Sequence, residues 1–185
     1  MENMHLCGES TPEWEKSYFD WFWNNTDERT GFWAGKDGAV IHEVPDFSYM
    51  AGGFHYMFNH EYAHMPLRYP EKIIDCCINM YDKKQLIPGF GKSADFINID
   101  WIYCLTRSAR QTTYRYAEVY DRLENFAESY LEYWQNVDWE SSENINDLHV
   151  LFGGVCALAE LQSALRGKMP SRRPLRLVLD RRPFI

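Results

Sequence analysis

Three short polar segments recur through this chain at nearly constant intervals, and each stands where an apolar helical pattern begins. They are residues 52–56 (Gly-Gly-Phe-His-Tyr), 97–101 (Ile-Asn-Ile-Asp-Trp) and 145–149 (Ile-Asn-Asp-Leu-His). His55 and Asp100 are 45 residues apart, and Asp100 and His149 are 49 residues apart. Each interval is about the length of two helices with their connections, as helical-hairpin repeats require. The spacing therefore predicts an all-α array of hairpins that brings one polar group per hairpin to the same end.

Length and composition favour one cytoplasmic domain. The chain has 185 residues, of which 45% are hydrophobic, so it can bury a full core. Its 12 Tyr, 11 Phe and 7 Trp supply rings for that core or for the walls of a cleft. No run approaches the roughly 18 apolar residues of a membrane span, and the N-terminus lacks a signal-peptide pattern. We expect no contact with a membrane.

The cysteines favour a reducing compartment. There are five of them, and Cys76 and Cys77 are adjacent, a spacing that suits neither an ordinary disulfide nor a metal-binding pair. Most of them lie inside helical patterns. We therefore expect free thiols, most of them buried.

The net charge of −8 is unevenly distributed along the chain. From Arg166 onward there are seven basic residues and one acidic residue, so the acidic groups are concentrated in the rest of the chain. An acidic body argues against nucleic acid as a partner. We expect the basic tail to fold back on the acidic body, with an anionic partner as the alternative.

Prolines and short polar residues mark the helix starts. The predicted first residues or caps are Pro12, Pro70, Asp95 or Asn98, and Asn146 or Asp147, with a further helix from about Tyr114. The predicted regions are an N-terminal helix and long loop (1–50, with the loop at 34–50), a helical-hairpin core (51–167) and an extended basic tail (168–185). The helix after Asp147 is apolar on most sides, which predicts that it is internal. Alternating Leu and Arg after Pro174 predict an extended strap across the helices.

Two segments resemble the repeat signature Gln-x3-Gly-x-Trp of the α/α-toroid superfamily. Residues 85–91 (Gln-Leu-Ile-Pro-Gly-Phe-Gly) have Gly in the Trp place, and residues 27–33 (Asp-Glu-Arg-Thr-Gly-Phe-Trp) have Asp in the Gln place. The superfamily includes terpenoid cyclases, protein prenyltransferases and, more distantly, six-hairpin glycosidases and polysaccharide lyases. The resemblance implies structural roles for Gln85 and Trp33. The Asp-rich catalytic motifs of terpene cyclases are missing, so we do not expect that reaction.

Length suggests a half or partial toroid. A ring of about six hairpins of ~47 residues needs roughly 280 residues, and this chain supplies little more than half. An open half-ring exposes an apolar edge. We therefore expect a homodimer, a partner chain that completes the ring, or a chain that is part of a longer protein.

The leading site prediction is the mouth of the array, where His55, Asp100 and His149 would meet, with Tyr56 close by. Toroid glycosidases and lyases use carboxylates, His and Tyr in such a mouth. Here Asp100 would be a general acid or base, and a histidine would be its proton-transfer partner. The competing interpretation is structural, because Asp near a helix start is usually a cap.

A second site prediction is the H-E-x-x-H match at residues 60–64. On a helix, His60 and His64 would share one face and bind zinc, with Glu61 as the base that activates a water. Pro66 lies two residues beyond His64 and argues against a continuing helix.

The sequence thus leaves three functions open. The first is a carbohydrate-related toroid enzyme, a glycoside hydrolase or polysaccharide lyase, that binds a small molecule or oligosaccharide without a cofactor. The second is a zinc-dependent hydrolase. The third is a non-catalytic interaction module that uses the exposed edge of the half-ring.

Overall fold

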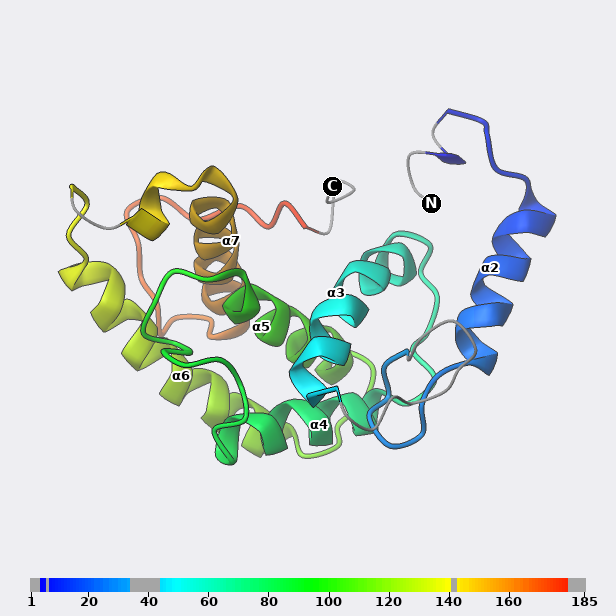
Figure 1. Ribbon diagram of the computed structural model, residues 1–185, viewed down its shortest axis with the longest axis horizontal. Helices are drawn as coiled ribbons and strands as arrows, with labels where there is room; N and C mark the ends of the chain where they lie inside the picture. The colour runs from blue at the N-terminus through cyan, green and yellow to red at the C-terminus, as the bar shows by residue number, and fades with distance from the viewer. Residues whose placement is uncertain (1–3, 6, 34–43, 141–142, 180–185) are drawn as a thin grey trace.

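A computed structural model describes residues 4–5, 7–33, 44–140 and 143–179 of the chain. Within these ranges the chain is helical and forms no β-strand (Figure 1). The helices are α2 (Pro12–Asn24), α3 (Asp46–Tyr62), α4 (Pro70–Asp82), α5 (Phe96–Ala109), α6 (Tyr116–Asn136) and α7 (Leu148–Ala164), with a short 3-10 helix η1 (Glu143–Asn146). None of the described helices is both long enough and apolar enough to cross a membrane. The all-α prediction is confirmed.

Local sequence sets where most helices begin. Thr11 caps α2 directly before Pro12, as its hydroxyl accepts a hydrogen bond from the first turn. Of the two candidate caps for α5, Asp95 takes the role, because its carboxylate accepts the Ile97 N–H at 2.8 Å. Asp147 caps α7 in the same way. Each cap satisfies a backbone N–H that has no partner within its helix.

Asn98, the other candidate cap of α5, has a different role. Its side-chain oxygen accepts the Gly91 N–H at 2.9 Å, and its amide donates to the Ser93 carbonyl at 2.9 Å. Asn98 is fully buried. It therefore ties the preceding loop to the first turn of α5.

Helix α3 corrects one predicted boundary. It begins at Asp46, inside the segment 34–50 that the sequence predicts to be a loop. The Arg29 guanidinium donates two hydrogen bonds to the Asp46 carboxylate, at 2.8 and 3.1 Å, and Met50 in the second turn is fully buried. Tertiary contacts thus extend the helix beyond what local sequence indicates. Residues 34–43 of the predicted loop lie outside the described residues.

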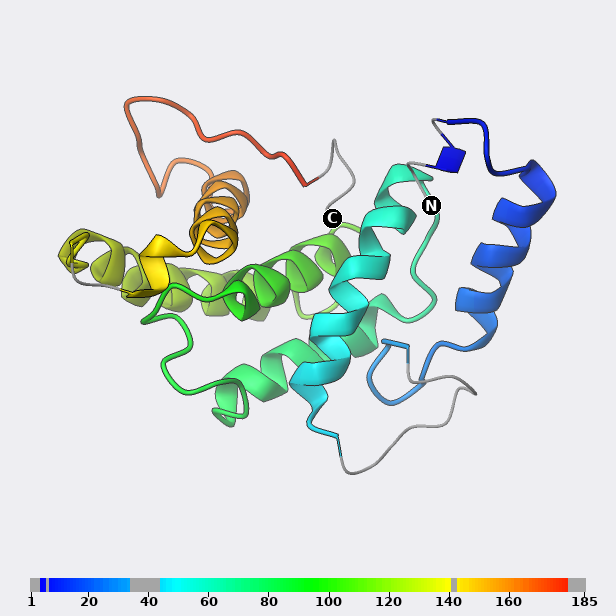
Figure 2. The same cartoon turned by 45° about the horizontal axis from the view of Figure 1, so that its top comes forward.

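The helices α3 to α7 pack in two layers (Figures 1 and 2). Helix α5 contacts α3 on one side and α7 on the other, so these three form one layer. Helices α4 and α6 contact each other and α5, and they form the second layer. Helix α2 lies on the far side of α3 from α7 in both views. The three helices that carry the polar landmarks therefore stand side by side.

The internal helix is α5, not α7 as the sequence predicts. All residues from Ile97 to Ser108 are buried. Helix α7 contacts only α5 and η1 extensively in the described part of the chain, because it is the last helix of its layer. Its outer face carries Leu148, which is 80% exposed, together with the exposed Val155. The apolar character of α7 therefore reflects an open face as well as a buried one.

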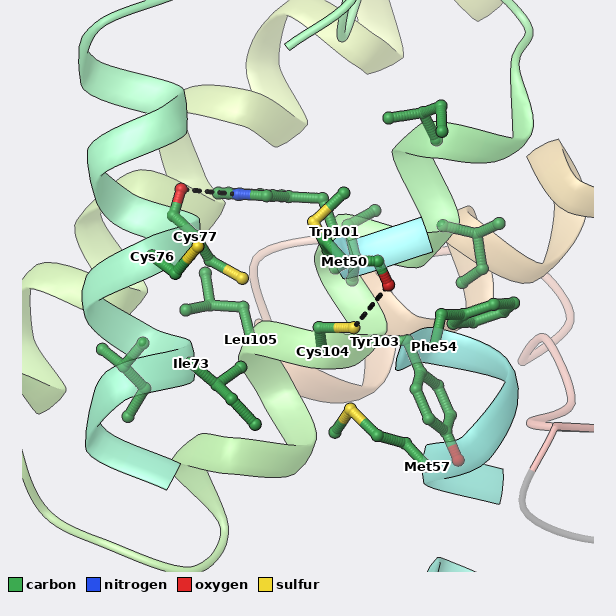
Figure 3. Packing of buried hydrophobic residues seen from close by; sticks show 14 of the residues in the cluster. Met50, Phe54, Met57, Ile73, Cys76, Cys77, Trp101, Tyr103, Cys104 and Leu105 are labelled. Carbon is green, nitrogen blue, oxygen red and sulfur yellow. Dashed lines mark hydrogen bonds between the residues drawn. The ribbon is translucent and has the colours of Figure 1, made fainter. Parts of the chain in front are cut away.

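The hydrophobic core contains the thiols of Cys76, Cys77, Cys104 and Cys156, and Figure 3 shows the first three of them. Trp101 is fully buried, and its indole N–H donates to the Cys77 carbonyl at 3.0 Å. The Cys104 thiol donates to the Met50 carbonyl at 3.9 Å. All five cysteines are free, and four are buried, with Cys7 exposed. Burial raises the pKa of Cys77 and Cys104 well above the ordinary thiol value, so both are inert thiols.

The chain after α7 runs back across the helices as an extended strap, as predicted, through its described part up to residue 179 (Figure 1). The Gln162 side chain holds it, by donating to the Met169 carbonyl at 3.0 Å and accepting the Leu175 N–H at 2.8 Å. Lys168 forms an ion pair with Glu124 of α6. At this point the basic tail meets the acidic body.

The two signature-like segments differ in their contacts. The Trp33 indole N–H donates to the Phe22 carbonyl near the end of α2 at 2.9 Å, and its ring stacks on His60. Gln85 is exposed, and its backbone N–H donates to the Met80 carbonyl at the end of α4. Trp33 thus ties the end of α2 and stacks on a neighbouring ring, whereas at Gln85 the backbone ties the helix end.

Candidate functional site

The structure brings His55, Asp100 and His149 together around one cavity. They come from α3, α5 and α7, the three adjacent helices of one layer. The cavity has a volume of about 270 Å³. Apart from these three, its lining is small or apolar: Ala51, Gly52, Phe54, Phe96, Ile99 and Gly153. A few convergent polar groups in a mostly apolar cavity are typical of a ligand site.

Asp100 is the most unusual group of this cavity. Its side chain is on the fifth residue of α5, and the residue is only 3% exposed. No hydrogen bond to its carboxyl is found from any residue that the structure describes. Burial, with a contribution from the Asp95 carboxylate, raises the pKa of Asp100 to about 8. At neutral pH it is therefore mostly a neutral acid, which can donate a proton.

Both histidines are exposed at the cavity. Burial, together with the nearby His149, lowers the pKa of His55. His55 is therefore neutral at neutral pH and can accept a proton. His149 is exposed, and its ring meets the edge of Phe96 with the ring centres 5.6 Å apart. The cavity thus combines a neutral acid with a neutral base.

Tyr56, the fourth residue of the predicted site, lies elsewhere. Its ring packs near Phe22 and Trp33, on the side of α3 that faces α2. Successive residues of a helix are rotated by roughly 100°. Because His55 faces the cavity, its neighbour Tyr56 faces away from it.

The H-E-x-x-H segment does not have the continuous helix that a zinc motif needs. Helix α3 ends at Tyr62, and His64 lies beyond it with a φ of 53°. His60 is buried with its ring stacked on Trp33, and its Nδ1 lies 3.0 Å from the Tyr56 carbonyl oxygen. Glu61 lies 3.5 Å from the Arg110 guanidinium.

His60 and His64 therefore do not share a helical face. The described part of the chain shows no cluster of three or more His, Cys, Asp or Glu side chains that could hold a metal ion.

A second and larger cavity was not foreseen from the sequence. It has a volume of about 540 Å³ and lies where α5 and α7 end, opposite the first cavity. Beneath it, Arg107 and Glu160 form a buried ion pair. A signal for this pair was present, since both are charged residues within largely apolar helical stretches. Which partner each would find depends on the packing of α5 against α7.

Comparison with models of protein families gives no match to this chain, and comparisons with curated proteins and with solved structures give none either. Function therefore rests on the residues and geometry of the cavities themselves.

Proposed function

We propose that the cavity of His55, Asp100 and His149 is the acid–base site of a carbohydrate-cleaving enzyme, of the polysaccharide lyase type. The observation that carries this proposal is the Asp100 carboxyl, which is buried against the cavity and lacks a hydrogen bond from the described residues. A carboxyl that caps a helix or has a structural role would accept a hydrogen bond or pair with a cation. Asp95 already caps α5. A strongly perturbed acid in a cavity is a functional candidate on physical grounds.

An elimination reaction needs one group that accepts a proton and one that donates a proton, and neutral His55 and neutral Asp100 fit these two roles. In a chain of uronate sugars, the carbon next to the carboxylate carries a weakly acidic hydrogen. His55 takes this proton, a carbon–carbon double bond forms, and the bond to the glycosidic oxygen breaks. Asp100 gives its proton to the departing oxygen. His149, exposed at the rim, donates a hydrogen bond to the substrate carboxylate.

Hydrolysis is the runner-up for the same cavity. Most glycosidases need two carboxyl groups, one on each side of the scissile bond. Among the described residues that line this cavity, Asp100 supplies the single carboxyl group. The pairing of one acid with a histidine therefore favours elimination.

The test is an assay that separates the two reactions. The protein is incubated with polygalacturonate, alginate and hyaluronan, and both the ultraviolet absorbance of unsaturated uronate and the new reducing ends are measured. Elimination raises both signals, whereas hydrolysis raises only the reducing ends. An increase in reducing ends alone would replace the lyase with a hydrolase, and no product from any of the three would refute the lyase proposal.

Variants then connect the activity to the cavity. Asp100→Asn and His55→Gln should each reduce turnover by a factor of roughly 10² to 10⁴, the usual contribution of a general acid or base. Tyr56→Phe is the matched control, because Tyr56 neighbours His55 in sequence but lies outside the cavity. Full activity in Asp100→Asn would remove the acid role.

A second candidate function, an interaction module, is favoured by the outer face of α7. Leu148 and Val155 lie two turns apart on this face and are both exposed. Because α7 ends its layer, a second copy of the chain could pack there and continue the array. A stable dimer by light scattering that dissociates in Leu148→Glu supports this role, and a monodisperse monomer counts against it.

A further inference from the structure

A third cavity lies between α2 and the end of α3, and aromatic rings form much of its wall. It has a volume of about 250 Å³. Six of its lining residues carry most of the argument: Phe19, Phe22, Trp23, Trp33, His60 and Met65. A cavity of roughly 150 Å³ in a protein core is enough to hold benzene. This one therefore has room for a single ring with a substituent.

Three of the rings surround His60. The His60 ring stacks on Trp33, with the ring centres 5.0 Å apart. The rings of Phe19 and Phe22 meet it nearly at right angles, with centres 5.3 and 5.7 Å away. All four side chains are buried. These contacts fix the imidazole among aromatic rings that come from α2 and from the loop after it.

His60 offers this cavity a hydrogen-bond acceptor. The residue is only 5% exposed, and its Nδ1 lies 3.0 Å from the Tyr56 carbonyl oxygen, one turn earlier in α3. Because a carbonyl oxygen only accepts, Nδ1 carries the hydrogen of this bond. Burial lowers the pKa of His60, so at neutral pH the ring is neutral and Nε2 has a lone pair. With Nδ1 turned to the helix backbone, Nε2 is the nitrogen left to face the cavity that His60 lines.

The other polar groups of the wall already have partners. The Trp33 indole N–H and the Thr26 hydroxyl both donate to the Phe22 carbonyl, at 2.9 and 2.8 Å. Arg68 donates to a backbone carbonyl of α2 at 2.7 Å, and the exposed Asp20 pairs with a lysine one turn earlier in α2. Nε2 of the imidazole, in contrast, has no hydrogen bond to any residue that the structure describes. A buried polar atom without a partner in a cavity calls for a ligand group that satisfies it.

We propose that this cavity binds a phenol, a single aromatic ring with one hydroxyl group. The hydroxyl donates to Nε2 of His60, and the ring packs against the aromatic walls in the edge and stacked arrangements that such rings prefer. Trp23 and Met65, which are both exposed, lie at the rim. The cavity is on the α2 side of α3, away from α7 (Figures 1 and 2), so it does not depend on the reaction proposed for the acid–base cavity.

The test is an NMR titration of the full chain, isotope-labelled at the methionine methyl groups. The Met65 methyl reports on this cavity, and the Met50 methyl, fully buried in the core, is the reference. Phenol should shift the Met65 signal until it saturates and leave the Met50 signal in place. Anisole has the ring but no hydroxyl hydrogen, so it should bind roughly tenfold more weakly. Cyclohexanol has the hydroxyl but no aromatic ring, and it should also bind more weakly than phenol.

Two tryptophans of α2 give a matched pair of variants. Trp23→Ala removes a ring at the rim and should weaken phenol binding by a factor of roughly two to ten. Trp21→Ala removes a similarly exposed ring, 43% against 46% exposed, that does not line the cavity. Residues two apart on a helix do not face each other, so Trp21→Ala should bind phenol as the parent does.

His60→Leu tests the acceptor itself. This variant should bind phenol and anisole equally, because it has no nitrogen to receive the hydroxyl hydrogen. Its circular dichroism spectrum shows whether it folds, and the three ligands on the parent protein decide the question if it does not. The proposal is overturned if phenol gives no saturable shift of the Met65 signal, or if anisole or cyclohexanol binds as tightly as phenol. It is also overturned if Trp21→Ala weakens binding as much as Trp23→Ala, or if folded His60→Leu still prefers phenol to anisole.

Discussion

Arg107 of α5 and Glu160 of α7 form a buried bidentate ion pair, in which the Arg107 side chain is 0% exposed and the Glu160 side chain is 2% exposed. The Arg107 guanidinium also lies over the Tyr103 ring, 4.0 Å from its centre. The pair joins the two helices with the most extensive mutual packing. It also places a charge-neutral floor beneath the larger cavity.

Arg107→Met should destabilise the protein by about 3–5 kcal/mol, because the Glu160 carboxylate would be left buried without its partner. The double variant Arg107→Met with Glu160→Met should regain a large part of this loss, since it leaves no buried charge. The free energy of unfolding is measured by urea titration. Arg122→Met, which breaks a partly exposed pair with Asp82, is the control and should cost less than about 1 kcal/mol. Equal losses in the single and double variants would contradict this account.

Asp100 should make stability depend on pH. Burial raises the pKa of Asp100 to about 8, whereas an unfolded Asp ionises near pH ~3.9. Between about pH 4 and 8 the folded state keeps a proton that the unfolded state has lost, so this contribution is full at the lower end and declines as pH rises, by up to about 1.4 kcal/mol per pH unit.

Asp100→Asn cannot ionise and should lack this slope. Urea titrations of both proteins across this pH range give the difference, in which the contributions of all other groups cancel. A difference that stays constant with pH would mean that Asp100 is ionised in the folded protein.

Two adjacent glycines of α3 should respond in opposite directions to alanine. A Cβ on Gly53 would lie 2.5 Å from a ring carbon of Phe32, which is fully buried, so Gly53→Ala should cost about 1–3 kcal/mol. A Cβ on Gly52 would meet nothing within 4 Å, so Gly52→Ala should stabilise the helix by up to about 1 kcal/mol. Thermal unfolding of the two variants decides this. A Gly53→Ala variant as stable as the parent or more stable would show that the Phe32 ring can move aside, and a destabilised Gly52→Ala variant would contradict the open space at that position.

The cap of α7 should be measurable by itself. The Asp147 carboxylate accepts the His149 N–H at 2.7 Å, so Asp147→Ala should destabilise the protein by about 1 kcal/mol. Asp147→Asn keeps an oxygen acceptor and should cost much less. If both substitutions cost the same in urea titrations, the negative charge at the helix start matters more than the cap hydrogen bond.

The sequence predicted part of the candidate site correctly. The regular interval between His55, Asp100 and His149 was enough to predict their convergence, because helices of similar length return the chain to the same end. Tyr56 was misplaced because successive residues of a helix are rotated by roughly 100°, so a direct neighbour of His55 does not share its face. The sequence did not decide whether His60 and His64 lie on one continuous helix. The structure decides it, because α3 ends at Tyr62 and His64 lies beyond that end.

The sequence by itself determined the helices and most of their ends, because caps such as Thr11, Asp95 and Asp147 act on residues within a turn of themselves. Tertiary structure alone decided which helix is internal, that Arg107 pairs with Glu160, and that the Asp100 side chain is buried away from solvent. These outcomes depend on contacts between residues far apart in the chain. Burial then sets the charge of Asp100, since the cost of ionising a carboxyl depends on what surrounds it in space.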